Sequence, residues 1–98
     1  MEKKLILKEW RQSKKDLKSV YEHINIMQKI IDCNQKIIED NKFWKGIDFS
    51  DRADMIAKLT KQNASANKNI IELKMLEVST KDSLQKLSFA LLGIKQND

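Results

Sequence analysis

Trp44-Lys45-Gly46 stands near the midpoint of the 98-residue chain and decides how the rest of the sequence is interpreted. The chain has no proline and only two glycines, so Gly46 is the one backbone breaker between its two halves. Each half repeats apolar residues at alternating steps of three and four, which is the spacing of an α-helix. The sequence therefore predicts an all-α protein in which a short turn separates two long helices.

The apolar residues of both predicted helices form matching stripes. If the helices run antiparallel, residues whose numbers add to 97 face each other, which pairs Ile31 with Ala66. The fold-back point then lies between residues 48 and 49, directly after Gly46, and this agreement favours a hairpin over one continuous rod. The first stripe comprises Ile6, Trp10, Leu17, Val20, Ile24, Met27, Ile31 and Ile38, with Ser13, Asn34 and Asn41 as polar members. The second comprises Ile56, Leu59, Ala66, Ile70, Leu73, Leu84, Leu87, Leu91 and Ile94, with Asn63, Glu77 and Thr80 as polar members.

The predicted fold is a single all-α domain over residues 1–98, an antiparallel, coiled-coil-like hairpin of two helices. We expect the first helix at about 3–43, the W-x-G turn at about 44–50 and the second helix at about 51–95. Asp48 or Ser50 is expected to cap the second helix. Four apolar side chains are expected to cluster around the bend, namely Phe43, Trp44, Ile47 and Phe49.

The two stripes meet along a seam, and the residues of both stripes are its seam residues. The same register places two amides of this seam, Asn34 and Asn63, opposite each other. A buried amide pair adds little stability, but slipped alignments that leave one amide among aliphatic side chains are penalised. We therefore expect Asn34 and Asn63 to set the register of the two helices.

A two-helix hairpin buries one stripe of each helix, and this chain carries further apolar residues beside both stripes. Leaving several large aliphatic side chains in water costs roughly 1.5–3 kcal/mol each and makes a surface adhesive. We therefore expect the hairpin to dimerise into a four-helix bundle, with a second copy or with a second small helical protein. The expected partner interface comprises Ile26, Ile30, Cys33 and Ile37 on the first helix, and Ile71, Val78 and Leu92 on the second.

No pattern in the sequence indicates catalysis, a metal site or a cofactor. His23 is the only histidine and Cys33 the only cysteine, so neither a histidine-pair metal site nor an internal disulfide is expected. There is no glycine-rich phosphate loop. We therefore expect a protein that is not an enzyme, with no catalytic residues, no metal ligands and no cofactor.

The apolar runs of the chain are short. None approaches the ~18 residues of a membrane span, and Leu5-Ile6-Leu7 is too short for the core of a signal peptide. We expect synthesis in the cytoplasm, no membrane span and, if the protein is secreted, export without a cleaved signal peptide.

Positive charge is concentrated at the N-terminus. The net charge is +5, and residues 1–18 hold seven basic and three acidic side chains. Such an arm could meet an acidic protein, an anionic membrane or nucleic acid. A solvated, lysine-rich helix face explains the same pattern and is the interpretation we prefer, so nucleic-acid binding is not expected.

A 98-residue chain that folds into a helical hairpin with W-x-G at its bend resembles the small WXG proteins of type VII secretion. These include the ESAT-like secreted dimers and the small helical partners of LXG toxins. Trp44 and Gly46 carry the resemblance through their residue types and their position near mid-chain. The predicted hairpin extends it over the whole sequence.

The resemblance implies a folded four-helix homodimer or heterodimer that is exported without a cleaved signal. It also implies that Trp44 and Gly46 shape the bend and that Trp44 contributes to a groove read by a partner. The family's export signal, a tyrosine followed four positions later by an acidic residue after the second helix, has no match, since Tyr21 is the only tyrosine. This favours a targeting or chaperone partner of a larger LXG-type effector over a protein exported on its own.

Two other functions are compatible with the sequence. Cytoplasmic flagellar-type export chaperones of the FlgN and FliT kind are also short and helical with an exposed apolar groove, and residues 59–92 are loosely similar to their second helix. The other function is that of a small basic regulator that binds nucleic acid through residues 1–18. Its binding would weaken steeply with added salt.

Overall fold

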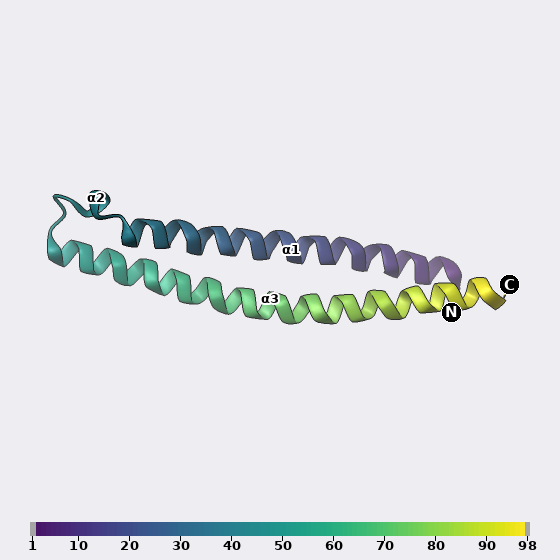
Figure 1. Ribbon diagram of the computed structural model, residues 1–98. Helices are drawn as coiled ribbons and strands as arrows, with labels where there is room; N and C mark the ends of the chain where they lie inside the picture. The colour runs from purple at the N-terminus through teal and green to yellow at the C-terminus, as the bar shows by residue number, and fades with distance from the viewer. Residues whose placement is uncertain (1, 98) are drawn as a thin grey trace. The chain divides into compact units, whose positions relative to one another are not determined.

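The protein is all-helical, as the sequence predicts. A computed structural model describes residues 2–97, with side chains described from residue 2 to residue 93. The described residues form α1 (Lys3–Glu39), α2 (Asn41–Trp44) and α3 (Phe49–Asn97), and they contain no strand (Figure 1). The chain divides into two compact units. Unit 1 comprises Met1–His23 and Leu73–Asp98, and unit 2 comprises Ile24–Glu72.

In unit 1, the N-terminal part of α1 packs against the C-terminal part of α3. The Trp10 indole Nε1 donates a hydrogen bond to the Ser88 hydroxyl at 3.0 Å, and that hydroxyl donates to the Leu84 carbonyl at 2.8 Å. Ile6 and Val20 are buried within unit 1. The two helical segments are thus joined by a tryptophan that satisfies its one polar atom across the interface.

A charged pair also lies at the seam of unit 1. The Lys81 ammonium is 2.9 Å from a Glu77 carboxylate oxygen and lies over the Tyr21 ring, 5.7 Å from its centroid. The hydrogen bond from Lys81 lowers the pKa of the Glu77 carboxyl below its ordinary value. Glu77 can therefore occupy a half-buried seam position in its charged form.

In unit 2, the end of α1 and the start of α3 lie side by side and run in opposite directions (Figure 1). The Asn34 amide donates to the Asn63 side-chain oxygen at 3.0 Å, and the Asn69 amide contacts the Met27 sulfur at 3.9 Å. Ala66 and Ile70 are buried in this interface. Buried apolar side chains and hydrogen-bonded amides thus share the interface of unit 2.

The two units bury predicted seam residues, and Trp44 is buried as well although it does not belong to the predicted seam. Every seam residue with a described side chain is buried or half-buried except Asn41, which is exposed in α2. The side chain of Ile94 lies outside the described residues. Among the described side chains none is completely buried, because a layer of two helices covers each seam residue from one direction only.

The first helix ends earlier than predicted, at Glu39 instead of residue 43. Asp40 leaves the helical conformation, with φ −86° and ψ 96°, and its carboxylate accepts hydrogen bonds from the backbone N–H groups of Lys42 and Phe43. An aspartate that bonds the backbone two and three residues ahead competes with continuation of a helix and favours the start of a new one. Residues 41–44 therefore form the separate helix α2.

The second helix begins at Phe49, two residues before the predicted start at 51. The Arg52 N–H donates to the Asp48 carbonyl at 2.9 Å as the first turn of α3 forms. The predicted apolar cluster at the bend is wrong for Phe49, whose side chain is 83% exposed. The sum-of-97 register places residues 45–48 opposite the first turn of α3, and these residues belong to the turn and provide no helix face to cover this ring.

Candidate functional site

The W-x-G segment forms a tight turn directly after α2. The Ile47 N–H donates to the Trp44 carbonyl at 3.0 Å, which closes a four-residue turn. Lys45 has φ −61° and ψ 127°, and Gly46 has φ +82°. These are the angles of a type II turn, whose third position requires a positive φ and therefore favours glycine. The spacing of the motif thus follows from the turn type: tryptophan opens the turn and glycine takes its third position.

Gly46→Ala is expected to lower the free energy of unfolding by about 1–2 kcal/mol, because an L-residue is strained at a positive φ. A Cβ at this position would meet no atom within 4 Å, so the whole effect comes from the backbone. Urea unfolding followed by circular dichroism measures it. Gly46→Asn should lose less, since asparagine tolerates this conformation. Equal losses for both variants would contradict the explanation.

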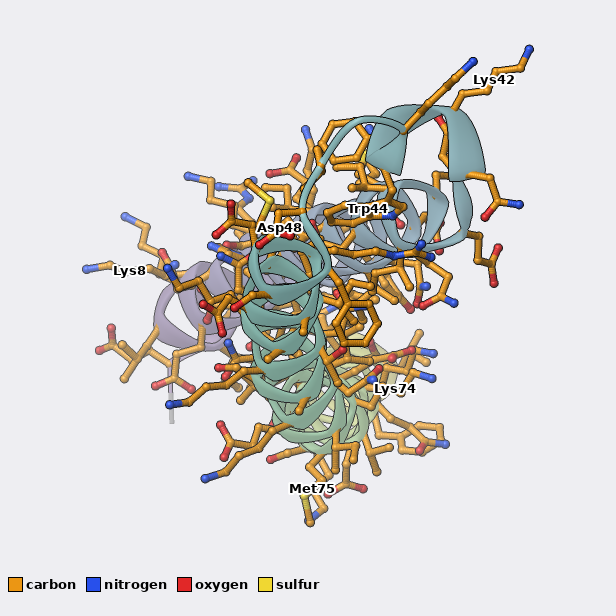
Figure 2. All side chains as sticks on the ribbon, turned by 90° about the vertical axis from the view of Figure 1, so that its left-hand side faces the viewer. Lys8, Lys42, Trp44, Asp48, Lys74 and Met75 are labelled. Atoms are coloured by element: carbon orange, nitrogen blue, oxygen red, sulfur yellow. The ribbon has the colours of Figure 1, made fainter. Side chains whose placement is uncertain are left out.

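Trp44 holds the end of α1, α2 and the start of α3 together. Its indole Nε1 donates to the Ile38 carbonyl at 3.2 Å, which satisfies a group left free where α1 stops. The Phe43 ring meets it edge-on with centroids 4.8 Å apart, and the Arg52 guanidinium lies 5.7 Å from the ring centroid. Only 3% of Trp44 is exposed, and Figure 2 shows it turned inward while Lys42 points outward.

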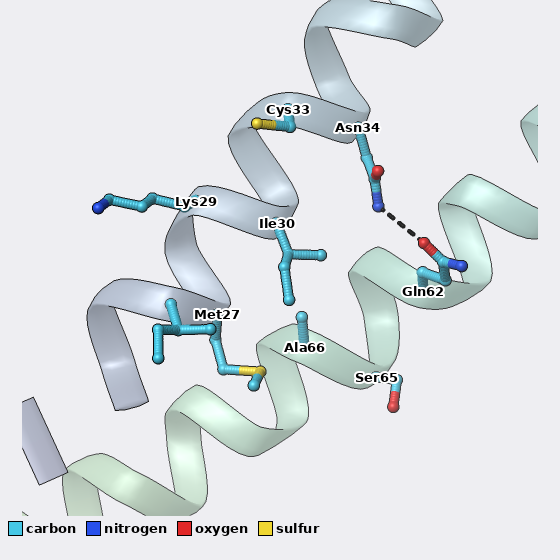
Figure 3. Close-up of a pocket in the computed structure, with 9 residues that line it drawn as sticks. Met27, Lys29, Ile30, Cys33, Asn34, Gln62, Ser65 and Ala66 are labelled. Atoms are coloured by element: carbon cyan, nitrogen blue, oxygen red, sulfur yellow. Dashed lines mark hydrogen bonds between the residues drawn. The ribbon is translucent and has the colours of Figure 1, made fainter. Parts of the chain in front are cut away.

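The Asn34 amide lies in the middle of the unit 2 interface. It is buried, and besides its bond to Asn63 it donates to the Gln62 side-chain oxygen at 3.2 Å (Figure 3). One amide group therefore joins α1 to two successive residues of α3. Sliding either helix by one turn would leave this buried amide facing aliphatic side chains.

Asn34→Leu is expected to raise the free energy of unfolding by about 1 kcal/mol, because it exchanges a desolvated amide for an aliphatic side chain. At the same time the helices should lose their single register, since no misaligned state is penalised any longer. Thermal unfolding measures the first effect, and disulfide trapping between cysteine pairs on α1 and α3 measures the second. A lower melting temperature with unchanged trapping would contradict both expectations.

An open apolar groove runs along one side of unit 2. Its main hollow, of about 710 Å³, has a wall of aliphatic and sulfur-bearing side chains from α1, and Figure 3 shows Ile30 pointing across it toward Ala66 on α3. Ile26 is 51% exposed here, and Ile30 and Cys33 are exposed too. The hollow is lined by Ile26, Met27, Lys29, Ile30, Cys33, Asn34, Gln62, Ser65 and Ala66.

The groove continues toward the bend through a second hollow. Gln62 lines both hollows, and the second one is lined by the buried Trp44 together with the exposed side chains of Phe43 and Met55. The second hollow is lined by Ile37, Phe43, Trp44, Met55, Lys58, Leu59 and Gln62. The surface hollows of unit 1 differ in character, since one is lined by Glu9, Gln12, Ser13, Ser83, Lys86 and Leu87.

The structure brings four of the predicted interface residues together and leaves three apart. Ile26, Ile30, Cys33 and Ile37 all line the groove of unit 2. Ile71 of unit 2, and Val78 and Leu92 of unit 1, are exposed on α3 and line none of the hollows described above. The residues that complete the groove on α3, Met55, Gln62 and Ser65, were not predicted. The sequence feature that could have identified them is that each one directly precedes a predicted seam residue.

The described residues contain no group of three or more histidine, cysteine, aspartate or glutamate side chains able to hold a metal ion. Every buried side-chain nitrogen and oxygen atom within them has a hydrogen-bond partner. No described helix combines the length and the apolar character needed to cross a membrane.

No protein-family model matches this chain, and no curated protein sequence and no solved structure shows significant similarity to it.

Proposed function

We propose that this chain is a non-enzymatic interaction protein, an antiparallel two-helix hairpin that pairs with another helical hairpin to form a four-helix bundle. The hydrogen bonds within each unit support the antiparallel alignment of the chain's own two helices. Asn34 bonds Asn63 in unit 2, and Trp10 bonds Ser88 in unit 1, and both contacts lie within one residue of the register in which paired numbers add to 97. Each unit by itself is thus compatible with one continuous seam.

The observation that carries the proposal is the exposed apolar groove of unit 2. Fully burying an isoleucine is worth roughly 1.5–3 kcal/mol, and Ile26 and Ile30 leave much of this unrealised in the free chain. Met27 and Met55 add adaptable side chains at two points along the groove. A partner helix laid into the groove would cover these residues together, as helices do in bundles.

We further propose that this partnership belongs to type VII secretion, with the chain acting as a WXG-like targeting or chaperone partner of an LXG-type effector. The type II turn supports this role, because it gives Trp44 and Gly46 the bend-forming function that the resemblance implies. Trp44 would be recognised as part of the groove lining and not as a protruding side chain, since only 3% of it is exposed.

The test is purification from the native host followed by mass spectrometry and light scattering. A stoichiometric complex with an LXG-type toxin or with a second small helical protein, of a mass that fits a four-helix assembly, is the expected result. Recovery with flagellin or hook-associated proteins would instead establish the flagellar chaperone alternative. Recovery with nucleic acid that is released by salt would establish the regulator alternative.

Ile30→Asp is expected to weaken partner binding at least about 100-fold, because it places a charge in the contact without a matching group. Met75→Asp is the matched control. Met75 is also exposed and points away from the helices in Figure 2, but it lies in unit 1 outside the groove. Calorimetric titration of both variants with the recovered partner measures the effect. Equal losses for the two variants would exclude the groove as the binding site.

A further inference from the structure

The charged residues that line the groove of unit 2 are lysines. Lys29 of α1 and Lys58 of α3 line the two hollows, and both are exposed. Lys36 follows Lys29 by two helical turns, and Lys61 follows Lys58 by three residues, so each lies on the same face of its helix as the lining lysine. By the same spacing Asp32 lies beside Lys29 and Lys36, and Asp54 lies beside Lys58. Lysines therefore outnumber carboxylates on these two faces, and the lining residues themselves carry only positive charge.

These lysines are not neutralised by carboxylates of the groove. None of the residues that line the two hollows is acidic. The ion pairs found among the described side chains, Lys81 with Glu77 and Lys86 with Asp82, both belong to unit 1. The groove thus combines apolar lining side chains with two lining charges, Lys29 and Lys58, that are both positive and form no ion pair among the described side chains.

This charge pattern opposes a second copy of the chain in the groove. In a two-fold symmetric contact the same surface meets itself, so the lysines would face each other. The chain as a whole carries a net charge of +5, which adds to the repulsion. A helix with carboxylates beside its apolar stripe would instead bury the apolar side chains of the groove and pair its carboxylates with the lysines beside them.

We infer that the groove of unit 2 binds an amphipathic helix from a different, acidic protein, with aliphatic residues against the apolar side chains of the groove and glutamate or aspartate against Lys29, Lys36, Lys58 and Lys61. This inference rests on the proposed function and names the chemistry of its partner. The α1 wall from Ile26 to Ile37 is about three turns long, or on the order of 17 Å, so a segment of about three turns fills it.

Cys33 gives a direct readout of this groove. It is the only cysteine, and its thiol is exposed within the main hollow (Figure 3). Two synthetic helical peptides of about three heptads serve as probes, with leucine and isoleucine along one stripe and either glutamate or lysine flanking it. Affinity is measured by calorimetry, and coverage of the groove by the rate at which a maleimide labels Cys33. We expect the acidic peptide to bind at least about tenfold more tightly than the basic one and to slow the labelling.

Charge reversal tests the lysines themselves. Lys29→Glu combined with Lys58→Glu should invert the preference, so that the basic peptide binds more tightly. Lys8→Glu combined with Lys15→Glu is the matched control, since it changes the net charge equally on an exposed face of unit 1. The control should lower the affinity for the acidic peptide by less than about threefold, because exposed charges far from the contact are screened.

Several outcomes would overturn the inference. Equal affinity for the two peptides, acidic binding without protection of Cys33, or equal effects of the two charge reversals would each do so. Protection of Cys33 in the free protein that disappears on dilution would place a second copy in the groove, which refutes the acidic partner and leaves the four-helix bundle intact. A monomer whose Cys33 is protected by neither peptide would contradict both the inference and the proposed function.

Discussion

Replacing Trp44 with alanine should lower the free energy of unfolding by about 3–5 kcal/mol, which is the cost of emptying a buried aromatic site. The side chain is 3% exposed and contacts α1 through Ile38, α2 through Phe43 and α3 through Arg52. A small domain has only about 5–15 kcal/mol of stability in total. The variant should therefore unfold at a much lower urea concentration.

Two further variants separate the causes of this effect. Trp44→Phe keeps an aromatic ring but removes the N–H that the Ile38 carbonyl accepts, so it should lose about 1–3 kcal/mol. Phe49→Ala removes a ring that is 83% exposed and should change stability by less than about 0.5 kcal/mol. If Trp44→Ala proved as mild as Phe49→Ala, Trp44 would be a recognition residue without a structural role.

Ile70→Ala is the second substitution with a large expected effect, a loss of about 2–3 kcal/mol of unfolding free energy. Ile70 is 7% exposed and belongs to the seam of unit 2. The interface there is thin, so neighbouring side chains cannot move in to fill the space that the isoleucine leaves. Chemical denaturation of the purified variant measures the loss.

The adjacent residue provides the control for Ile70. Ile71 has the same side chain and backbone environment but is 62% exposed, so Ile71→Ala should alter stability by less than about 0.5 kcal/mol. Losses of similar size at the two positions would show that Ile71 is covered in solution. A large loss at Ile71 alone would mean that the seam has been assigned to the wrong face of α3.

The helical seams could be predicted from the sequence because they follow from periodicity alone. Isoleucine, leucine and valine at steps of three and four fix which face of a long helix is apolar, whatever its neighbours do. The antiparallel register in which paired residue numbers add to 97 predicts that Asn34 lies opposite Asn63, and the two side chains are hydrogen bonded in the structure. This local result needed no knowledge of the loop geometry.

The bend could be predicted only in outline. The Asp40 carboxylate accepts hydrogen bonds from the backbone N–H groups of Lys42 and Phe43, and these bonds end α1 and start α2. Hydrophobic periodicity contains no information about such bonds. Aspartate is a preferred residue at the start of a helix, and Asp40, three residues before Phe43 and four before Trp44, is the available sequence signal. The role of Trp44 as donor to the end of α1 depends on that break, so it could not be foreseen.

The groove was predicted as a stripe on one helix but not as a complete site. Its α3 side is formed by Met55, Gln62 and Ser65, which are too varied in chemistry to stand out as a stripe. Which lysines lie beside the groove depends on which face of α3 lies next to Ile26 and Ile30, and this follows from the packing of the two helices. The apolar side chains of α1 in the groove could therefore be predicted from sequence periodicity, whereas the α3 residues and the lysines beside them could be identified only from the structure.

The labelling of Cys33 inside cells of the native host tests the central claim, that a helical partner covers the groove of unit 2. The exposed thiol of the free protein should react quickly with a cell-permeable maleimide once the protein has been purified alone. In the cell the same thiol should be protected, and it should become reactive when Ile30→Asp prevents the partner from binding. Equal labelling of Cys33 in the cell and in the purified protein would contradict the claim.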